Sequence, residues 1–482
     1  MKKVLYFFVF ASTLFFALVS GCTDNKNLPV SPPLVDNENN GFETFDVAKI
    51  FAENCATSGC HAGTDPVNGL SIESHSALMK GSSNRPLAGA DNFGGEVVIP
   101  YNSEKSLLYQ MITDNITPSG IHSDVSLTDE EISTIKDWID AGAKDNNGVV
   151  PFSNPTYRVF VCNQGGDYVS VIDGDEMVVS RLINVDFLSE VDAPHMVKLK
   201  DGYLYLTLIG DGEFLKIDTD DLSVTGKLTG IEKAGMIQIS PDGSKAYVSR
   251  SSTSASIYNT IFVVDIQNMT VIKEINLPVT GVPHGIALTP DGQKLYVANL
   301  TKNRISLVDA VNDEFVDDIV LSDSIDHEPM QLAVSPDGMY LYCSARATGK
   351  LIVLRTSDNT IIAEIDVAPM PMQLAITSDG SRIYVPSMMT STVSVIEKNG
   401  ETWTKTAEVS HPALNMLHGI DLTADEKYLY VSSRNNDGMF QPPYKVNGEG
   451  NIGTVGILDT QTNQFVKVIE IEEFGAGLVV EK

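Results

Sequence analysis

A short turn motif recurs along most of the chain, and its period constrains the fold more than any other feature. Each copy sets an apolar segment before a turn of the Pro-Asp-Gly kind and a second apolar segment after it. Successive copies lie about 41 to 49 residues apart, which is the length of a four-stranded propeller blade. The copies stand at Lys200–Gly202, Ser240–Gly243, Thr289–Gly292, Ser335–Gly338, Ser378–Gly380 and Thr423–Asp425.

The strands that leave these turns predict seven blades. The first of them has no entering strand ahead of it, so the segment Phe474–Val480 is expected to supply one and to close the ring. Closure removes sheet edges that would otherwise pair with other chains. The seven outgoing strands start near Tyr157, Tyr203, Lys245, Lys294, Tyr340, Arg382 and Tyr428.

Four of the units carry the dipeptide Tyr-Val, at Tyr247, Tyr296, Tyr384 and Tyr430. The units resemble the YVTN family of propellers, and the resemblance implies an all-β seven-bladed propeller over residues 149–482. It implies little about function, because propellers host enzymes, binding platforms and scaffolds alike. The insertion Asn435–Asn451, rich in Asn, Gly and Pro, is expected to project from one face as a recognition loop.

The first residues predict export and a lipid anchor. Two lysines precede an apolar run that extends to Val19, which is typical of a signal peptide over residues 1–21. Val19–Cys22 resembles the bacterial lipobox, which implies lipidation of Cys22 and a membrane anchor without a spanning helix. Thr23, where inner-membrane lipoproteins carry aspartate, favours an outer-membrane lipoprotein of the cell envelope, either periplasmic or surface-exposed. Residues 22–41 lack apolar periodicity and are expected to form a flexible tether.

Residues 42–148 contain a pattern associated with covalent haem. A short apolar helix is expected to lead directly into Cys55-Ala56-Thr57-Ser58-Gly59-Cys60-His61, which is a C-x4-C-H motif. In the commoner C-x-x-C-H motif two thiols bind haem through thioethers and the histidine ligates the iron. Farther along, Thr128 and Glu131 are placed to form a capping box ahead of an apolar helical stripe.

The run from Leu127 to Ala143, with the C-x4-C-H motif, resembles cytochrome c modules of the planctomycete type. The resemblance implies a small all-α cytochrome c-like domain with one covalently attached haem c. Cys55 and Cys60 would form the thioethers, and His61 would be the proximal iron ligand. The family carries Met-Pro before the terminal helix, whereas this chain has Thr117-Pro118. The distal ligand is therefore left open between His122, Met111 and a vacant sixth position.

A second candidate site lies in the propeller. Innermost strands line the central channel of a propeller, and three histidines and three methionines are predicted at one equivalent position of these strands. Imidazole and thioether both suit copper, and such a ring could also ligate a second haem. Alternatively, the imidazoles link neighbouring blades by hydrogen bonds and the methionines fill crevices. The six residues are His195, Met236, His284, Met330, Met372 and His418.

Three functions follow from these patterns. The first is a membrane-tethered c-type cytochrome in periplasmic electron transfer, whose propeller docks a redox partner protein or positions the haem. The second is an oxidoreductase with a further metal or cofactor in the channel. The third is a haem-free surface-binding lipoprotein in which Cys55 and Cys60 form a disulfide, as an oxidising compartment allows. The formal net charge of −30 disfavours nucleic acid as a partner.

Overall fold

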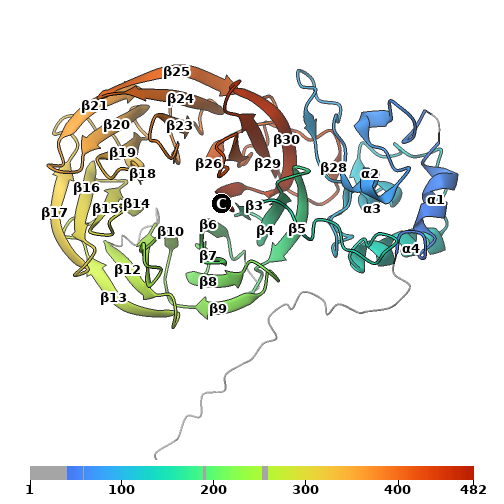
Figure 1. Ribbon diagram of the computed structural model, residues 1–482, viewed down its shortest axis with the longest axis horizontal. Helices are drawn as coiled ribbons and strands as arrows, with labels where there is room; N and C mark the ends of the chain where they lie inside the picture. Colours follow the sequence, from blue (N-terminus) through green and yellow to red (C-terminus); the bar gives the residue numbers. More distant parts are fainter. Residues whose placement is uncertain (1–40, 58, 188–190, 252–258) are drawn as a thin grey trace, which may run out of the picture.

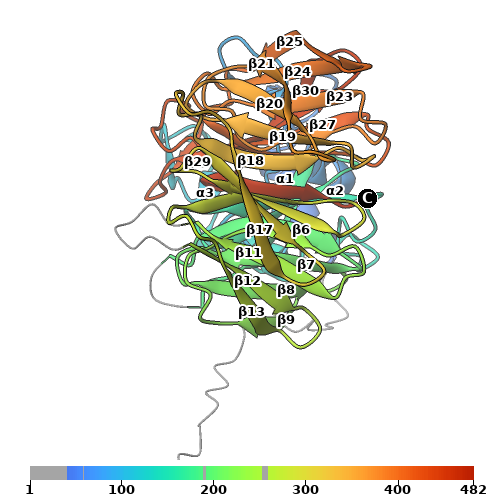
Figure 2. The same ribbon diagram turned by 90° about the vertical axis from the view of Figure 1, so that its left-hand side faces the viewer.

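The computed structural model describes residues 41–57, 59–187, 191–251 and 259–482. Within them, seven sheets surround a central axis and a helical module lies against one side of the ring (Figure 1). Figure 2 shows the ring edge-on, from the side opposite to the module. The seven-bladed propeller predicted from the repeats is confirmed. The expected signal peptide, most of the tether and the lipidated Cys22 lie outside the described residues.

Each blade runs from an inner strand at the axis to an outer strand at the rim, and strands that are neighbours in a blade pair antiparallel. Blade 1 is β31 (Gly475–Val480), β3 (Arg158–Asn163), β4 (Tyr168–Asp173) and β5 (Val178–Asn184); blade 2 is β6 (Pro194–Lys200), β7 (Tyr203–Leu208), β8 (Glu213–Asp218) and β9 (Val224–Leu228); blade 3 is β10 (Ala234–Ile239), β11 (Lys245–Arg250), β12 (Thr260–Asp265) and β13 (Thr270–Asn276); blade 4 is β14 (Pro283–Leu288), β15 (Lys294–Asn299), β16 (Arg304–Asp309) and β17 (Glu314–Val320).

The remaining blades follow the same order. Blade 5 is β18 (Pro329–Val334), β19 (Tyr340–Ala345), β20 (Lys350–Arg355) and β21 (Ile361–Asp366); blade 6 is β22 (Ala375–Ile376), β23 (Arg382–Pro386), β24 (Thr392–Asn399) and β25 (Thr402–Ser410); blade 7 is β26 (Leu417–Leu422), β27 (Tyr428–Ser433), β29 (Ile452–Asp459) and β30 (Gln464–Glu473).

The last strand of the chain completes the first blade. β31 pairs antiparallel with β3, with Val480 opposite Val159 and Leu478 opposite Val161. The expectation that the C-terminal segment closes the ring is confirmed. Because its partner strand lies more than 300 residues earlier in the sequence, this pairing carries a large loop-closure entropy and forms only when the ring is nearly complete.

Side-chain hydrogen bonds explain why the turn motif repeats. In blade 3 the hydroxyl of Ser240 donates to Asp242 at 2.6 Å and accepts from the backbone N–H of Lys245 at 2.9 Å. Hydrogen bonds from Ser240, and then from Ser244, lower the pKa of Asp242 to about 2, so the carboxylate is ionised in the turn. The same hydroxyl-to-carboxylate contact recurs in Thr289–Asp291, Ser335–Asp337, Thr377–Asp379 and Thr423–Asp425.

The tyrosine of the Tyr-Val pairs links one blade to the next. The hydroxyl of Tyr247 in blade 3 donates to the carboxylate of Asp313 in blade 4 at 2.7 Å, and that of Tyr296 donates to Asn359 in blade 5 at 3.0 Å. Across the closure, the hydroxyl of Tyr430 in blade 7 lies 3.0 Å from that of Tyr157. A buried hydroxyl without a partner would be costly, so this residue type registers the blades.

The N-terminal module contains four short helices rather than a clear all-α domain. Its core joins α1 to α4 through Phe42, Phe51 and Trp138, and the predicted capping box of Thr128 and Glu131 is present. The expectation of an all-α domain is wrong, because long loops and two short strands separate the helices. The helices are α1 (Val47–Asn54), α2 (His75–Met79), α3 (Leu107–Ile112) and α4 (Asp129–Asp140); the strands are β1 (Phe93–Gly94) and β2 (Ile116–Thr117).

Both short strands of the module pair with the propeller. β1 lies parallel to β30 and adds a fifth strand to blade 7, and the buried ring of Phe93 packs in the core of that blade. β2 pairs with β28 (Lys445–Val446) of the insertion. The module therefore docks on the rim of blade 7, and its strand edges are satisfied by the propeller.

The sequence predicted that the insertion projects from one face, and this prediction is wrong. Residues 435–451 lie against the module: Lys105 pairs with Glu449 at 2.8 Å, and Thr117 donates to Asn447 at 2.8 Å. The polar residues of the insertion make contacts within the chain. Composition alone does not distinguish such contacts from contacts with a partner protein. Among the described residues no helix is long and apolar enough to cross a bilayer.

Candidate functional site

A cavity of about 360 Å³ lies between the module and the insertion. Its volume falls within the range of small-molecule and cofactor pockets. Most of its wall is apolar, and a few polar groups gather where it meets the propeller. The apolar lining includes Val67, Leu70, Ile72, Val97, Leu107, Leu108, Ile112, Ile121, Val125 and Leu127; the polar lining includes Asn68, Ser82, Arg85 and Tyr444.

The C-x4-C-H segment forms one side of this cavity. Cys55 caps α1, with its N–H donating to the carbonyl of Phe51 at 2.8 Å, and its half-buried side chain lines the cavity. The chain then loops out through Gly59, whose φ of +88° suits glycine. Cys60 is exposed, and both thiols are free. Burial, with a smaller contribution from Cys60, raises the pKa of the Cys55 thiol to about 11.

The ring of His61 is oriented by the backbone. Its Nδ1 lies 3.2 Å from the carbonyl oxygen of Leu70, and donation to that carbonyl fixes the tautomer with its proton on Nδ1. Nε2 then carries the lone pair that a metal binds. A hydrogen bond of this kind orients the ring of a metal-ligating histidine, and here it is formed within the module.

His122 lines the same cavity as His61, and their rings lie close together. The two ring centroids are 6.1 Å apart and the ring planes are inclined by 38°. Two imidazoles that bind one metal from opposite sides have centroids about 6 Å apart, because each metal–nitrogen bond is about 2 Å long. Burial, with a contribution from His61, lowers the pKa of His122, which favours its neutral, ligating form. Its Nδ1 is buried without a hydrogen bond.

Met111, the other predicted distal candidate, comes from α3 and lines the same cavity. Both candidates line the cavity, and His122 makes a ring contact with His61. The structure therefore places Cys55, His61, His122 and Met111 around one cavity, with Cys60 exposed.

Sequence reasoning missed the polar groups at the propeller end of the cavity. Tyr444 comes from the insertion and accepts a hydrogen bond from the Nδ2 of Asn68 at 2.7 Å. Arg85 is almost fully buried and pairs with Glu470 of β30 at 2.7 Å. Neither residue belongs to a motif, and each lies hundreds of residues from its partner in the sequence. No sequence pattern could therefore have identified them.

The predicted histidine ring of the channel is partly correct. His195 lies at the centre of three buried imidazoles, with its centroid 6.4 Å from that of His284 and 5.9 Å from that of His418. Met330 and Met372 pack together in a small apolar cluster. The ring nitrogens are only partly used, since His195 Nε2 has no hydrogen-bond partner among the described residues.

Met236 does not belong to this ring. In β10 the first residue, Ala234, pairs with the last residue of the next strand, as Pro194 does in β6. Gly235 is therefore the residue equivalent to His195, and Met236 lies one residue deeper. The sequence alignment failed here by one position because Met236 is the first large side chain of its strand.

The guanidinium of Arg434 beside the three imidazoles disfavours binding of a metal cation. Arg434 is buried, and its proximity helps to lower the pKa of His195, His284 and His418, after the larger effect of burial. Within the described residues it forms no ion pair with an acidic side chain, and these residues hold no group of three His, Cys, Asp or Glu arranged for a metal ion. A fixed guanidinium at this place repels a metal cation.

Comparisons with known proteins bear on the propeller alone. A family model described as "Lactonase, 7-bladed beta-propeller" matches residues 206–314. A functionally unknown protein from Desulfotomaculum acetoxidans DSM 771 is 16% identical, with a TM-score of 0.55, and the match covers 67% of this chain and 99% of that one. A putative 6-phosphogluconolactonase from Bacteroides fragilis NCTC 9343 is 15% identical, with a TM-score of 0.53 and coverage of 68% and 98%.

A protein from Lactobacillus plantarum gives a similar result, with 15% identity, a TM-score of 0.54 and coverage of 68% and 100%. No curated protein matches the chain significantly in sequence. At these identities the likeness shows the fold alone. The chain carries a seven-bladed β-propeller of the lactonase/YVTN type.

Proposed function

We propose that this chain is a membrane-tethered c-type cytochrome of the cell envelope, in which the module holds one haem c. The propeller would position that haem for a redox partner protein. The observation that carries the proposal is the pair of imidazoles of His61 and His122, 6.1 Å apart in an apolar cavity that Cys55 also lines.

The residues of the cavity fit a haem in their chemistry. His61 has its Nε2 left free by the hydrogen bond to Leu70, and burial favours the neutral form of His122. Cys55 lines the cavity and Cys60 is exposed; both thiols are free, as thioether formation requires. A bound haem c supplies a one-electron iron couple, and the apolar wall would exclude water from it.

Ligation by two histidines sets an expectation for the potential. Thioether ligation by methionine raises the potential of a haem, so replacing it with imidazole lowers it. Ligation by His61 and His122, rather than by His61 and Met111, would therefore favour a donor of electrons at low potential over a high-potential acceptor. The single covalent attachment site expected from the sequence limits the module to one haem.

The attachment of the module to blade 7 supports a positioning role for the propeller. The pairing of β1 with β30 and that of β2 with β28 join the module to the ring at two points. The cavity is lined by Tyr444 of the propeller insertion as well as by the module. A partner protein that docks on the propeller beside the module would therefore meet the haem in a fixed orientation.

The test is a haem count on protein produced with its own signal sequence, in a bacterial host that carries haem-ligation machinery. We expect one haem per chain that stays attached under denaturing conditions and gives a c-type pyridine haemochrome. Cys55→Ser and Cys60→Ser should each reduce covalent attachment. Cys343→Ser is the matched control, because that thiol is buried in β19 of the propeller and should leave the haem unchanged.

A mature protein without haem, in which mass spectrometry finds Cys55 disulfide-bonded to Cys60, would contradict the proposal. It would favour a haem-free binding lipoprotein instead. The other alternative, an oxidoreductase with a second metal in the channel, predicts a metal in the purified protein beyond haem iron. The guanidinium of Arg434 beside the channel histidines argues against that outcome.

A further inference from the structure

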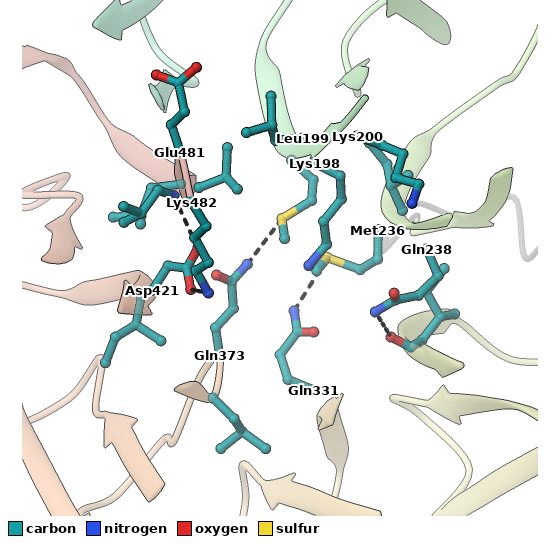
Figure 3. Close-up of a pocket in the computed structure, with 18 of the residues that line it drawn as sticks. Lys198, Leu199, Lys200, Met236, Gln238, Gln331, Gln373, Asp421, Glu481 and Lys482 are labelled. Atoms are coloured by element: carbon teal, nitrogen blue, oxygen red, sulfur yellow. Dashed lines mark hydrogen bonds and ion pairs between the residues drawn. The ribbon is translucent and has the colours of Figure 1, made fainter. Parts of the chain in front are cut away.

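A second cavity, of about 620 Å³, opens at one end of the central channel, away from the three histidines. Inner strands from around the ring contribute its wall, and Figure 3 shows their side chains converging on the axis. Met196 and Met236 contribute two sulfur atoms to the wall, two glutamines extend toward them, and a third glutamine belongs to the lining (Figure 3). The glutamines are Gln238, Gln331 and Gln373.

The charges that line this cavity are nearly all neutralised within the protein. Six charged side chains belong to the lining, three of each sign, and five of them already have an ion-pair partner at 4 Å or less. These pairs are Lys200 with Asp201 (3.7 Å), Lys482 with Asp421 (3.0 Å) and Glu481 with Arg158 outside the cavity (2.7 Å).

The sixth charged side chain, Lys198, has no such partner. It comes from β6, is partly buried, and extends into the cavity toward the glutamines (Figure 3). Among the described residues it forms neither an ion pair nor a hydrogen bond through its ammonium group. Burial lowers the pKa of Lys198, against the opposing effect of Asp421. An ammonium group held away from water without a counter-charge is unfavourable, so the cavity carries one positive charge to be matched.

Gln238 donates to the carbonyl of Ile286 at 3.0 Å, whereas the other two glutamines hold only weak partners. The side-chain amide of Gln331 donates to the sulfur of Met236 at 3.3 Å, and that of Gln373 donates to the sulfur of Met196 at 3.1 Å. A thioether is a poor acceptor, so either amide can exchange it for an oxygen of a ligand at little cost. Two adjustable amides beside one unmatched cation form a recognition site for a polar anion.

We propose that this cavity binds a small organic carboxylate, with the carboxylate on Lys198 and the remaining polar atoms on Gln331 and Gln373. The single unmatched cation limits the charge of the ligand to −1, because the carboxylates of Asp421 and Glu481 line the same space and repel a dianion. The site is separate from the proposed haem cavity, and neither proposal depends on the other.

Thermal unfolding of the purified full-length protein tests this proposal, with acetate, lactate and benzoate as probes. Acetamide, lactamide and benzamide, at matched ionic strength, are the neutral controls. We expect at least one carboxylate at 10 mM concentration to raise Tm by about 2 °C or more, with no effect of its amide. No shift with any of the three carboxylates overturns the proposal, as does a shift with inorganic phosphate alone.

Two lysine variants locate the effect. Lys198→Met removes the unmatched charge, so without ligand its Tm should equal or exceed that of the wild type, and the carboxylate shift should vanish. Lys200→Met is the matched control, because Lys200 lines the same cavity but is paired with Asp201; it should keep the shift. Equal shifts in the wild type and Lys198→Met would place the binding elsewhere and overturn the proposal.

A measurement on the wild type avoids any effect of substitution on folding. An amine-reactive ester acylates the amine of Lys198, and peptide mass spectrometry measures the rate of this labelling. The carboxylate that raises Tm should slow labelling of Lys198 several-fold and leave that of Lys350 unchanged, since Lys350 lies at the start of β20 in blade 5, outside the cavity. Labelling of Lys198 that is unaffected by the carboxylate overturns the proposal.

Discussion

The hydroxyl of Tyr444 accepts a hydrogen bond from the side-chain amide of Asn68 at 2.7 Å, although the two residues are 376 positions apart. Both line the cavity of the module. The insertion of blade 7 is therefore part of the cavity wall, and the module and the propeller form the candidate cofactor site together.

Two substitutions of Tyr444 separate its hydrogen bond from its packing. Tyr444→Phe loses one hydrogen bond and should lower the free energy of unfolding by about 1 kcal/mol. Tyr444→Ala also removes the ring from the cavity wall and should cost about 2–3 kcal/mol. Urea unfolding followed by circular dichroism measures both. Equal costs for the two variants would mean that the ring does not close the cavity.

The ion pair between Arg85 and Glu470 links the module to β30 and is buried, with 2% and 15% of the two side chains exposed. Arg85→Met leaves Glu470 without its counter-charge and should cost about 3–5 kcal/mol. Replacing both, as Arg85→Met with Glu470→Leu, should recover most of that loss. Limited proteolysis of the module and urea unfolding are the measurements; a double variant as unstable as the single one would contradict this account.

The fold could be predicted from the sequence because the repeats encode local contacts. The hydroxyl-to-carboxylate contact of Ser240 with Asp242 lies within a single turn, so it leaves a pattern in every blade. The closing strand could be identified because the first blade lacked one. The docking of the module could not, since β1 and β2 are only two residues long and their partners lie hundreds of residues away.

The candidate site, like the fold, could be predicted from the sequence only in part. Cys55 and His61 share a motif. His122 was a candidate because it follows Pro118, where the resembling family carries Met-Pro. Asn68 and Tyr444 meet only through the tertiary fold. In the channel, the one-residue error at Met236 arose because the equivalent position in β10 is Gly235, which has no side chain, so the next large side chain was aligned with the histidines instead.

Substitution at the two candidate distal ligands should give distinct spectra in the haem-loaded protein. His122→Ala removes the imidazole that faces His61, so a low-spin haem should become high-spin and bind carbon monoxide in its reduced form. Met111→Leu keeps the apolar wall and should leave the spectrum unchanged. A spectrum that responds to Met111→Leu and not to His122→Ala would identify the methionine as the ligand instead.

Removal of the closing strand should destabilise the propeller well beyond its share of the chain. Deletion of Gly475–Lys482 exposes the edge of β3 and the inner face of blade 1, where Leu478 is 3% exposed. Leu478→Ala alone should cost about 2–5 kcal/mol, and the deletion should abolish cooperative unfolding. Deletion of Lys482 alone is the control, because this residue lies beyond β31. Differential scanning calorimetry compares the three, and an unchanged melting profile for the larger deletion would contradict the role of β31 in closure.

The channel histidines should make the propeller sensitive to acid. Burial lowers the pKa of His284 to about 4, whereas an unfolded histidine titrates near pH 6.5. As pH falls from about 6.5 to about 4, the unfolded chain takes up a proton that the folded ring does not, so stability decreases across this window and levels off below it. A shift of this size corresponds to roughly 3 kcal/mol, and His195 and His418 act in the same direction. Urea midpoints at pH 7 and pH 4.5 measure the loss of stability, with His284→Gln as the comparison. The amide of the glutamine can still donate to the carbonyl of Met330, which His284 contacts at 3.1 Å. The variant should lose less stability than the wild type between the two pH values. Equal losses would assign the acid sensitivity to groups other than His284, since the carboxylates of the turns titrate identically in both proteins.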